Sequence, residues 1–201
     1  MKEIVAPTYP LSREAFCKAL RTGHGRAVVQ ATQFGAEPFR NDILVAATTS
    51  LSFDDQIEGT RERWLAELVI AADLVDAVIA TPIHDDLDAF RPRCLLLREL
   101  APRRPELVRA ALREAAGFDK SVVVESALIE LVDLEGVDGL IFGVRRLGEL
   151  LSTENGFWCD DVLLDRYDER HEQGAGRKFL ARIGVRHLSP PTWCHRTFSL
   201  D

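Results

Sequence analysis

The chain has 201 residues, of which 46% are hydrophobic, and its formal net charge is -7. This length and apolar content suit one substantial core or one elongated array, so we expect a single domain over residues 1–201. The acidic balance disfavours a dedicated nucleic-acid binder, because such proteins neutralise phosphates with lysine and arginine. The longest uncharged run, Ile43 to Phe53, is too short to span a bilayer. We therefore expect a cytoplasmic protein that does not associate with membranes.

Four cysteines, Cys17, Cys94, Cys159 and Cys194, are scattered singly along the chain. This distribution is typical of reduced thiols in a reducing compartment, where cysteine behaves as a small apolar residue. A metal site built from Cys159, Cys194 and His195 has only the residue types in its favour, because structural zinc sites draw their ligands from closely spaced pairs. We expect neither a metal nor another cofactor.

Helical periodicity recurs along the chain, whereas the alternation typical of half-buried strands is nearly absent. Ser12 is placed to cap a first helix that ends at Gly23. A second, short helix is predicted to begin after Gly25 and to end near Gly35, and a third covers residues 36–49.

Farther along the chain, prolines and glycines set the predicted boundaries. One helix runs through Trp64 and continues, bent, to Ile79, and Pro92 is expected to break the following segment. The remaining predicted helices are 85–90, 93–100, one that begins at Pro105 and ends before Gly117, 122–132, 135–151, 159–170, and a short one through Phe179 and Ile183. The 135–151 segment contains four glycines, so close packing against a neighbouring helix is expected there.

Short connections make consecutive helices antiparallel neighbours. The predicted fold is therefore all-α, a short α-solenoid of antiparallel helix pairs. The helix-pair array covers residues 11–151, and capping helices with an extended tail cover 154–201. Terminal units of solenoids are often atypical in this way.

A family resemblance rests on three stretches, Thr22-Gly23-His24-Gly25-Arg26-Ala27, Pro38-Phe39-Arg40, and Glu58-Gly59-Thr60-Arg61 with Trp64-Leu65. Over residues 11–151 the chain resembles uncharacterised bacterial proteins with HEAT-like helical repeats. The resemblance implies a curved α-solenoid and, by analogy with HEAT and armadillo folds, a protein-binding role. It implies no catalytic activity.

Two turns are candidate binding sites. His24 and Arg26 could present an imidazole and a guanidinium to an anion at a helix N-terminus, although the two glycines around His24 also fit a plain helix-to-helix turn. Glu58 and Arg61 can pair at i, i+3 beside Trp64, which could anchor an interface or belong to the core. We predict that these two turns face each other.

Charge is segregated along the chain. Residues 53–90 hold ten acidic residues, and the 91–115 segment holds seven arginines, Arg91, Arg93, Arg98, Arg103, Arg104, Arg109 and Arg113. Such blocks either solvate helix faces or guide a partner of opposite charge. The acidic block favours a partner protein with a basic segment.

No G-x-S-x-G elbow, H-E-x-x-H pair or Walker motif occurs. The leading hypothesis is therefore a non-enzymatic protein-interaction or scaffold protein that binds a macromolecule on one face of its helical stack. The alternative is a HEAT-like enzyme of the DNA-glycosylase type, whose arginine block would have to converge on one surface. A homodimer formed through the glycine-bearing helix, residues 136–148, is also possible.

Overall fold

The computed structural model describes residues 8–22, 25–49, 60–83, 87–118, 121–153 and 161–182. Within these ranges the chain forms eleven α-helices, one 3-10 helix and no β-strand. The prediction of an all-α fold is confirmed. None of the described helices combines the length and apolar character needed to cross a bilayer.

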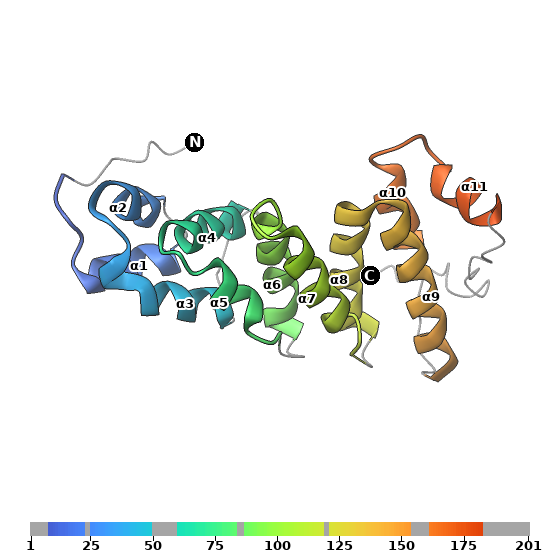
Figure 1. Cartoon of the computed structure of the whole chain (residues 1–201), viewed down its shortest axis with the longest axis horizontal. Helices are drawn as coiled ribbons and strands as arrows, with labels where there is room; N and C mark the ends of the chain where they lie inside the picture. Colours follow the sequence, from blue (N-terminus) through green and yellow to red (C-terminus); the bar gives the residue numbers. More distant parts are fainter. Residues whose placement is uncertain are drawn as a thin grey trace, which may run out of the picture. The chain divides into compact units, whose positions relative to one another are not determined.

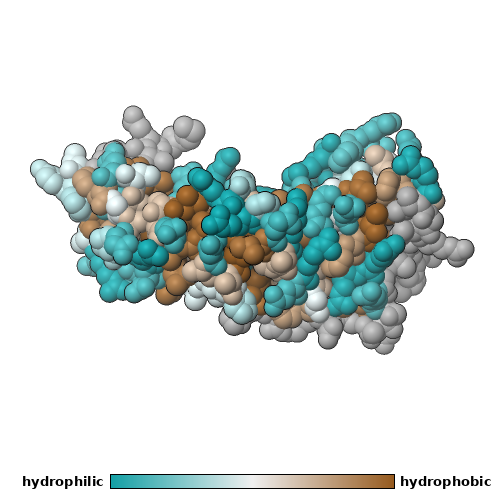
Figure 2. All heavy atoms as spheres, viewed as in Figure 1, coloured by the Kyte–Doolittle hydropathy of each residue, from teal (hydrophilic) through white to brown (hydrophobic). Residues whose placement is uncertain are grey.

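The chain divides into two compact units, Met1–Ala111 and Leu112–Asp201. Each unit buries its own apolar helix faces, and the visible face is largely hydrophilic, with apolar side chains showing between the helices (Figure 2). The single domain and the solenoid stacking stay predictions.

The first unit opens with three short helices, α1 (Arg13–Arg21), α2 (Arg26–Phe34) and α3 (Arg40–Thr48), of which α1 packs against both α2 and α3 (Figure 1). The hydroxyl of Ser12 accepts a hydrogen bond from the amide of Ala15 at 3.3 Å, so the predicted cap of α1 is confirmed. Gly35 ends α2 with a φ of 89°, a conformation that favours glycine. A 3-10 turn, Glu37–Phe39, leads into α3.

The predicted bent helix from Trp64 to Ile79 is two helices, α4 (Thr60–Ala71) and α5 (Val75–Ala80). Asp73, with a φ of 53°, lies in the break between them. Aspartate tolerates this left-handed conformation better than most residues, because its short polar side chain can bond locally. The continuous-helix prediction was therefore wrong at this turn.

The predicted break at Pro92 was also wrong, because α6 (Leu87–Leu100) is one helix with Pro92 inside it. Proline removes one hydrogen bond from the helix interior, at a cost of about 3 kcal/mol. Burial offsets this loss, since Phe90 is 1% exposed and Cys94 is fully buried on either side of the proline.

The core of the first unit is formed by one side chain or more from each of these helices. Phe16 of α1 stacks on Phe39 with ring centroids 4.0 Å apart, and both rings are buried. Ile43, Val69 and Leu97 extend the core through α3, α4 and α6 with no exposed surface.

Helix α7 (Pro105–Ala115) begins at Pro105, as predicted. The sequence boundary between the two units, after Ala111, falls within this helix. The second unit continues with α8 (Ser121–Glu135) and α9 (Val137–Thr153), which pack closely on each other. Gly136 connects them with a φ of 60°. The predicted helix at 122–132 is thereby confirmed despite its three consecutive valines.

The glycines of α9 allow the close packing that was predicted from the sequence. A Cβ added at Gly139 would overlap the carbonyl oxygen of Leu131 in α8, so the two backbones are in contact there. A Cβ at Gly143 would lie 2.6 Å from Cδ1 of Leu163, which is the end of a flexible side chain. Any larger residue at position 139 would therefore require α8 or α9 to move.

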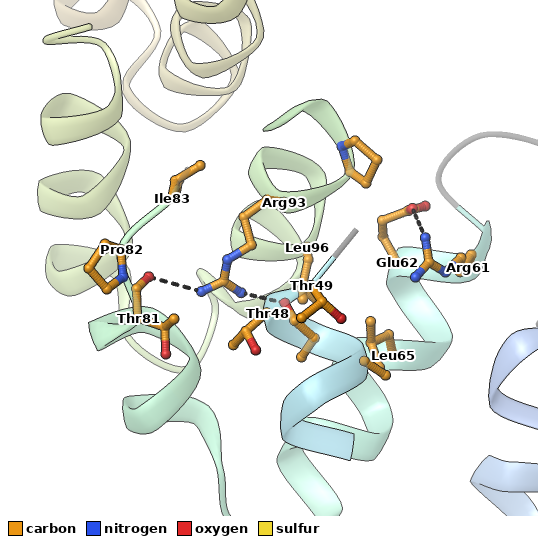
Figure 3. Close-up of a pocket in the computed structure, with 13 residues that line it drawn as sticks. Thr48, Thr49, Arg61, Glu62, Leu65, Thr81, Pro82, Ile83, Arg93 and Leu96 are labelled. Atoms are coloured by element: carbon orange, nitrogen blue, oxygen red, sulfur yellow. Dashed lines mark hydrogen bonds and ion pairs between the residues drawn. The ribbon is translucent and has the colours of Figure 1, made fainter. Parts of the chain in front are cut away.

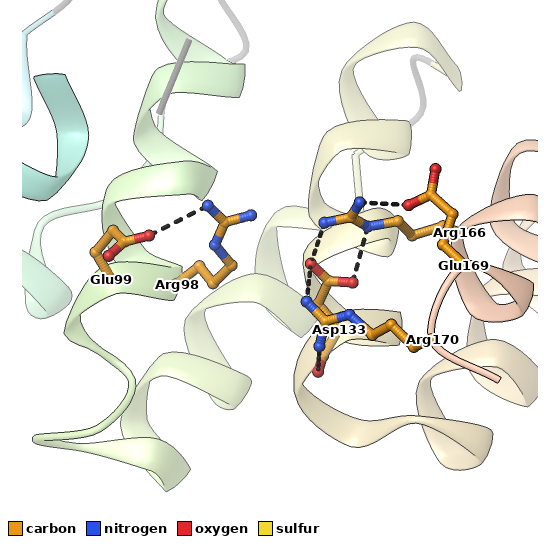
Figure 4. A network of polar contacts seen from close by, with 6 residues as sticks. All are labelled: Arg98, Glu99, Asp133, Arg166, Glu169 and Arg170. Carbon is orange, nitrogen blue, oxygen red and sulfur yellow. Dashed lines mark hydrogen bonds and ion pairs between the residues drawn. The ribbon is translucent and has the colours of Figure 1, made fainter. Parts of the chain in front are cut away.

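Two further helices, α10 (Asp161–Asp168) and α11 (Ala175–Arg182), complete the described part of the second unit. The Asp133 carboxylate of α8, 1% exposed, accepts from Arg166 Nε at 2.8 Å and pairs with Arg170 at 2.9 Å (Figure 4). The hydrogen bonds that Arg166 donates to Asp133 raise the pKa of Arg166. This network fixes α10 against the end of α8, while the predicted tail lies outside the described residues.

Replacing Gly139 with alanine separates helix propensity from packing. Propensity alone would stabilise the helix by about 1 kcal/mol, whereas the overlap with Leu131 is expected to destabilise the protein by about 1–3 kcal/mol. Guanidinium unfolding monitored by circular dichroism gives the free energy of unfolding. Gly143→Ala is the matched control in the same helix and should lose less stability, because Leu163 can change its rotamer. Equal or greater stability of Gly139→Ala would contradict the backbone contact.

Candidate functional site

A cavity of about 350 Å³ lies in the first unit, where the end of α3, the start of α4, the end of α5 and the middle of α6 meet (Figure 3). We call it the α3–α6 pocket. Its apolar wall includes Ala46, Leu65, Pro82, Ile83 and Leu96. Its polar lining consists of three threonines, two arginines and one glutamate, namely Thr48, Thr49, Thr81, Arg61, Arg93 and Glu62.

Arg93 of α6 is the central polar group of the pocket wall. Its Nη1 donates to the carbonyl oxygen of Ala47 at 2.9 Å, and its Nη2 donates to the carbonyls of Val78 and Thr81, the latter at 3.3 Å. The residue is only 6% exposed. These acceptors lie at the ends of α3 and α5, where helix carbonyls have no partner within the helix. One guanidinium therefore caps two helices and joins them to a third.

No carboxylate among the described residues forms an ion pair with Arg93, and its Nε has no hydrogen-bond partner there. Each helix C-terminus carries about half a negative charge, so two of them together stabilise one cation. Burial lowers the pKa of Arg93 to about 10, which leaves it protonated at neutral pH. The pocket wall thus holds a fixed positive charge that no described acidic side chain neutralises.

Arg61 and Glu62 stand beside each other in the first turns of α4 and point toward the same pocket (Figure 3). Arg61 Nη1 lies 4.0 Å from Glu62 Oε1, with side chains 13% and 9% exposed. Burial lowers the pKa of Arg61, and the Glu62 charge partly offsets this effect. Arg61 also lines a smaller cavity of about 20 Å³ next to Trp64 and Leu65.

The threonine hydroxyls of the pocket use their hydrogens inside the protein. Thr48, Thr49 and Thr81 donate to the carbonyls four residues earlier, at 2.8, 2.7 and 2.9 Å. Their oxygens can still accept a hydrogen bond, but their hydrogens are used, and the hydrogen bonds found among the described residues join none of these hydroxyls to a base that would make it nucleophilic. Among the described lining residues, the two guanidiniums are the groups that can attract an anion.

The structure places three of the five residues predicted as binding residues. Arg61 and Trp64 lie together on α4 beside the smaller cavity, and Arg26 is exposed on α2 and does not line either pocket. His24 and Glu58 lie outside the described residues, so the prediction that their turns face each other stays a prediction.

Sequence reasoning missed Arg93 because it treated this residue as one member of a basic block. A usable signal was present, since Arg93 directly precedes Cys94-Leu95-Leu96-Leu97, where a buried neighbourhood is expected. An arginine in such surroundings needs several acceptors, and free carbonyls at helix ends are a common source.

Several other arginines of the basic block pair with carboxylates within their own unit. The pairs are Arg98 with Glu99, Arg104 with Asp76, Arg109 with Glu106, and Arg113 with Glu135. These pairings reduce the charge that the block could direct at a polyanion. In the described part of the chain, no cluster of three or more His, Cys, Asp or Glu is arranged to hold a metal ion.

No protein-family model, no curated protein and no solved structure matches this chain.

The double capping by Arg93 predicts a large stability loss when it is replaced. In Arg93→Met a shorter, apolar side chain replaces the guanidinium. The carbonyls of Ala47 and Thr81 lose this donor, and that of Val78 keeps only the amide of Thr81, so we expect the free energy of unfolding to fall by about 2–5 kcal/mol. The stability of Arg93→Lys should lie between those of the wild type and Arg93→Met. A lysine keeps the positive charge, but it lacks the planar guanidinium that donates to both helix ends. Urea unfolding of both variants measures the effect.

The exposed Arg26→Met is the control and should change stability by less than about 0.5 kcal/mol. If Arg93→Met unfolds at the same urea concentration as this control, Arg93 does not hold the helix ends together.

Proposed function

We propose that this protein is a non-enzymatic interaction protein and that the α3–α6 pocket holds an anionic group of a partner protein. The observation that carries the proposal is the buried guanidinium of Arg93 in the wall of a cavity of about 350 Å³, without a pairing carboxylate among the described residues. A cavity of this size lies within the range of small-ligand pockets, about 300–1,000 Å³.

A fixed, partly desolvated positive charge attracts an anion more strongly than an exposed arginine does, because the surrounding dielectric constant is low. Arg93 needs no rearrangement to present this charge, since its hydrogen bonds to Ala47 and Thr81 already hold it in place. Arg61 supplies a second cation on the opposite helix of the pocket. Preorganisation of this kind reduces the entropy lost on binding.

The wider architecture belongs to the same proposal. Helices that follow one another in the chain, such as α1 and α2 or α8 and α9, pack together, which supports stacking of helix pairs as a short HEAT-like α-solenoid. Cys17 and Cys94 form no disulfide, which supports action in a reducing compartment such as the cytoplasm. A partner with a basic segment, favoured by the acidic block of the sequence, would meet other surfaces than this pocket.

No observation favours the glycosylase alternative. An enzyme on DNA needs a basic surface that tracks phosphates, and Arg98, Arg104 and Arg109 are paired with carboxylates.

Affinity capture from an extract of the source cells, followed by quantitative mass spectrometry, tests the proposal. Three forms of the full chain serve as bait, namely the wild type, Thr49→Trp, which adds bulk at an exposed position of the pocket lining, and Arg26→Gln as a matched control. We expect partners that the wild type and Arg26→Gln capture equally and that Thr49→Trp loses at least tenfold. Circular dichroism confirms that all three baits are folded.

The best such partner is then purified, and its affinity is measured by calorimetry. Arg61→Gln should weaken binding by about 1.5–3 kcal/mol, the usual worth of a charged hydrogen bond. Capture that is only background at low and at physiological salt, or capture that Thr49→Trp leaves unchanged, would refute the pocket as the binding site.

A further inference from the structure

Helix α5 has six residues and is the shortest of the described α-helices, and residues 81–83 that follow it line the α3–α6 pocket. A helix of this length forms few hydrogen bonds of its own and depends on contacts with the rest of the protein. In the turn before it, Asp73 has a positive φ, and the amide of Leu74 donates back to the carbonyl of Val69 at 2.9 Å, as at a left-handed helix end. Residues 74–83, which we call the α5 strap, therefore run from a sharp turn to the pocket wall.

Apolar side chains attach the strap to the rest of the first unit. Leu74, Val78 and Ile79 are buried, and α5 packs against α3 and α4. Burial of apolar surface makes the attached position the populated one, so a detached position is a minor state.

Two arginines near the surface hold the beginning of α5. Arg40 Nη2 of α3 donates to the carbonyl of Asp73 at 3.3 Å. Arg104 pairs with Asp76 in the first turn of α5, with Nε and Oδ1 2.7 Å apart. Both contacts are exposed, so solvent and salt screen them and each contributes little to stability.

A buried contact holds the end of the strap. Arg93 Nη2 donates to the carbonyls of Thr81 (Figure 3) and Val78. Its Nη1 donates to the carbonyl of Ala47 in α3, outside the strap. Detachment of the strap breaks the bonds of Nη2 and leaves that of Nη1, so the guanidinium stays in the pocket wall and can re-form them.

From a short helix, exposed contacts at its beginning and one buried contact at its end, we propose that the α5 strap opens and closes the α3–α6 pocket, with Asp73 as its hinge and Arg93 as its latch. Movement of residues 81–83 widens the pocket, because these residues form part of its lining. The anionic group of the partner enters while the strap is open, and the closed strap restores the wall around it. Residues at the ends of helices are common hinges for such motions. The inference rests on the proposed function and describes how its pocket is controlled.

Hydrogen exchange of the full chain in increasing urea, followed by NMR, tests the strap. Protection factors of α5 amides should be lower than those of α4 and α6 by about tenfold or more. The opening that exposes α5 should depend little on urea, because it exposes little surface. If the amides of all three helices show one protection factor and one urea dependence, the first unit opens as a whole and the strap is refuted.

Three variants identify the contacts that break on opening. Arg93→Lys should lower the protection of α5 by about tenfold or more, because the planar fork that donates to both carbonyls is lost. Arg104→Gln removes the exposed pair with Asp76 and should lower it about two- to threefold. Arg109→Gln, the matched control, removes an exposed pair with Glu106 on α7 and should leave it unchanged.

The protection of α5 decides the outcome in each case. If it is the same in Arg93→Lys and in the wild type, Arg93 is not the latch. If Arg93→Lys does not fold, equal protection of α5 in Arg104→Gln and Arg109→Gln overturns the strap.

Binding kinetics connect the strap to the pocket. The probe is a partner that the wild type captures and Thr49→Trp loses. Arg104→Gln should raise its association and dissociation rates by the same factor by which it raises the opening of α5, and should leave the Kd within about twofold. Unchanged rates would mean that entry does not need the strap, which overturns its role at the pocket.

The two proposals fail in different ways. If α5 opens only with the whole unit but Thr49→Trp still loses the partner, the strap is wrong and the pocket remains the binding site. If Thr49→Trp captures the same partners as the wild type, the pocket has no binding role. The strap then falls as its gate, even where hydrogen exchange shows that α5 opens by itself.

Discussion

The first unit depends on the guanidinium of Arg93, which links the ends of α3 and α5 to the middle of α6. Carbonyls at helix ends need donors, and a buried cation needs negative charge around it; this arrangement meets both needs without a carboxylate. A cavity lies beside the guanidinium, where segments of α3, α4 and α6 and the end of α5 meet. The pocket is therefore a by-product of how the helices are joined, and its charge has a structural origin.

The division of roles between the two arginines follows from this. Arg93 uses Nη1 and Nη2 to hold the helix ends together, whereas Arg61 lines the cavity from α4. Glu62 limits the total positive charge beside them.

Most helices could be predicted because their signals are local. Ser12 caps α1, Pro105 begins α7, and the apolar run after Ser121 continues long enough to specify α8. The two errors have separate causes. The break between α4 and α5 occurs at Asp73, which has a positive φ, and no glycine or proline marks it in the sequence. Pro92 sits inside a helix because Phe90 and Cys94 are buried beside it.

The site was less accessible to sequence reasoning than the fold. Arg61 and Trp64 were found because they share one turn of a helix, but the role of Arg93 depends on carbonyls that are 46, 15 and 12 residues away in the chain. Helical periodicity in the sequence does not indicate which residues that are far apart in the chain contact each other. Only the apolar neighbours of Arg93 gave a hint that it is buried.

The backbone contact at Gly139 has a consequence for the motions of the second unit. Two helices whose main chains touch cannot separate by a change of rotamers, so α8 and α9 open only together. We expect local opening to begin at α11, because a helix of eight residues has few backbone hydrogen bonds of its own. Amide hydrogens of α8 and α9 near this contact should exchange with solvent most slowly, because they exchange only when the unit opens cooperatively. Amide hydrogens of α11 should exchange faster, through local opening of that helix.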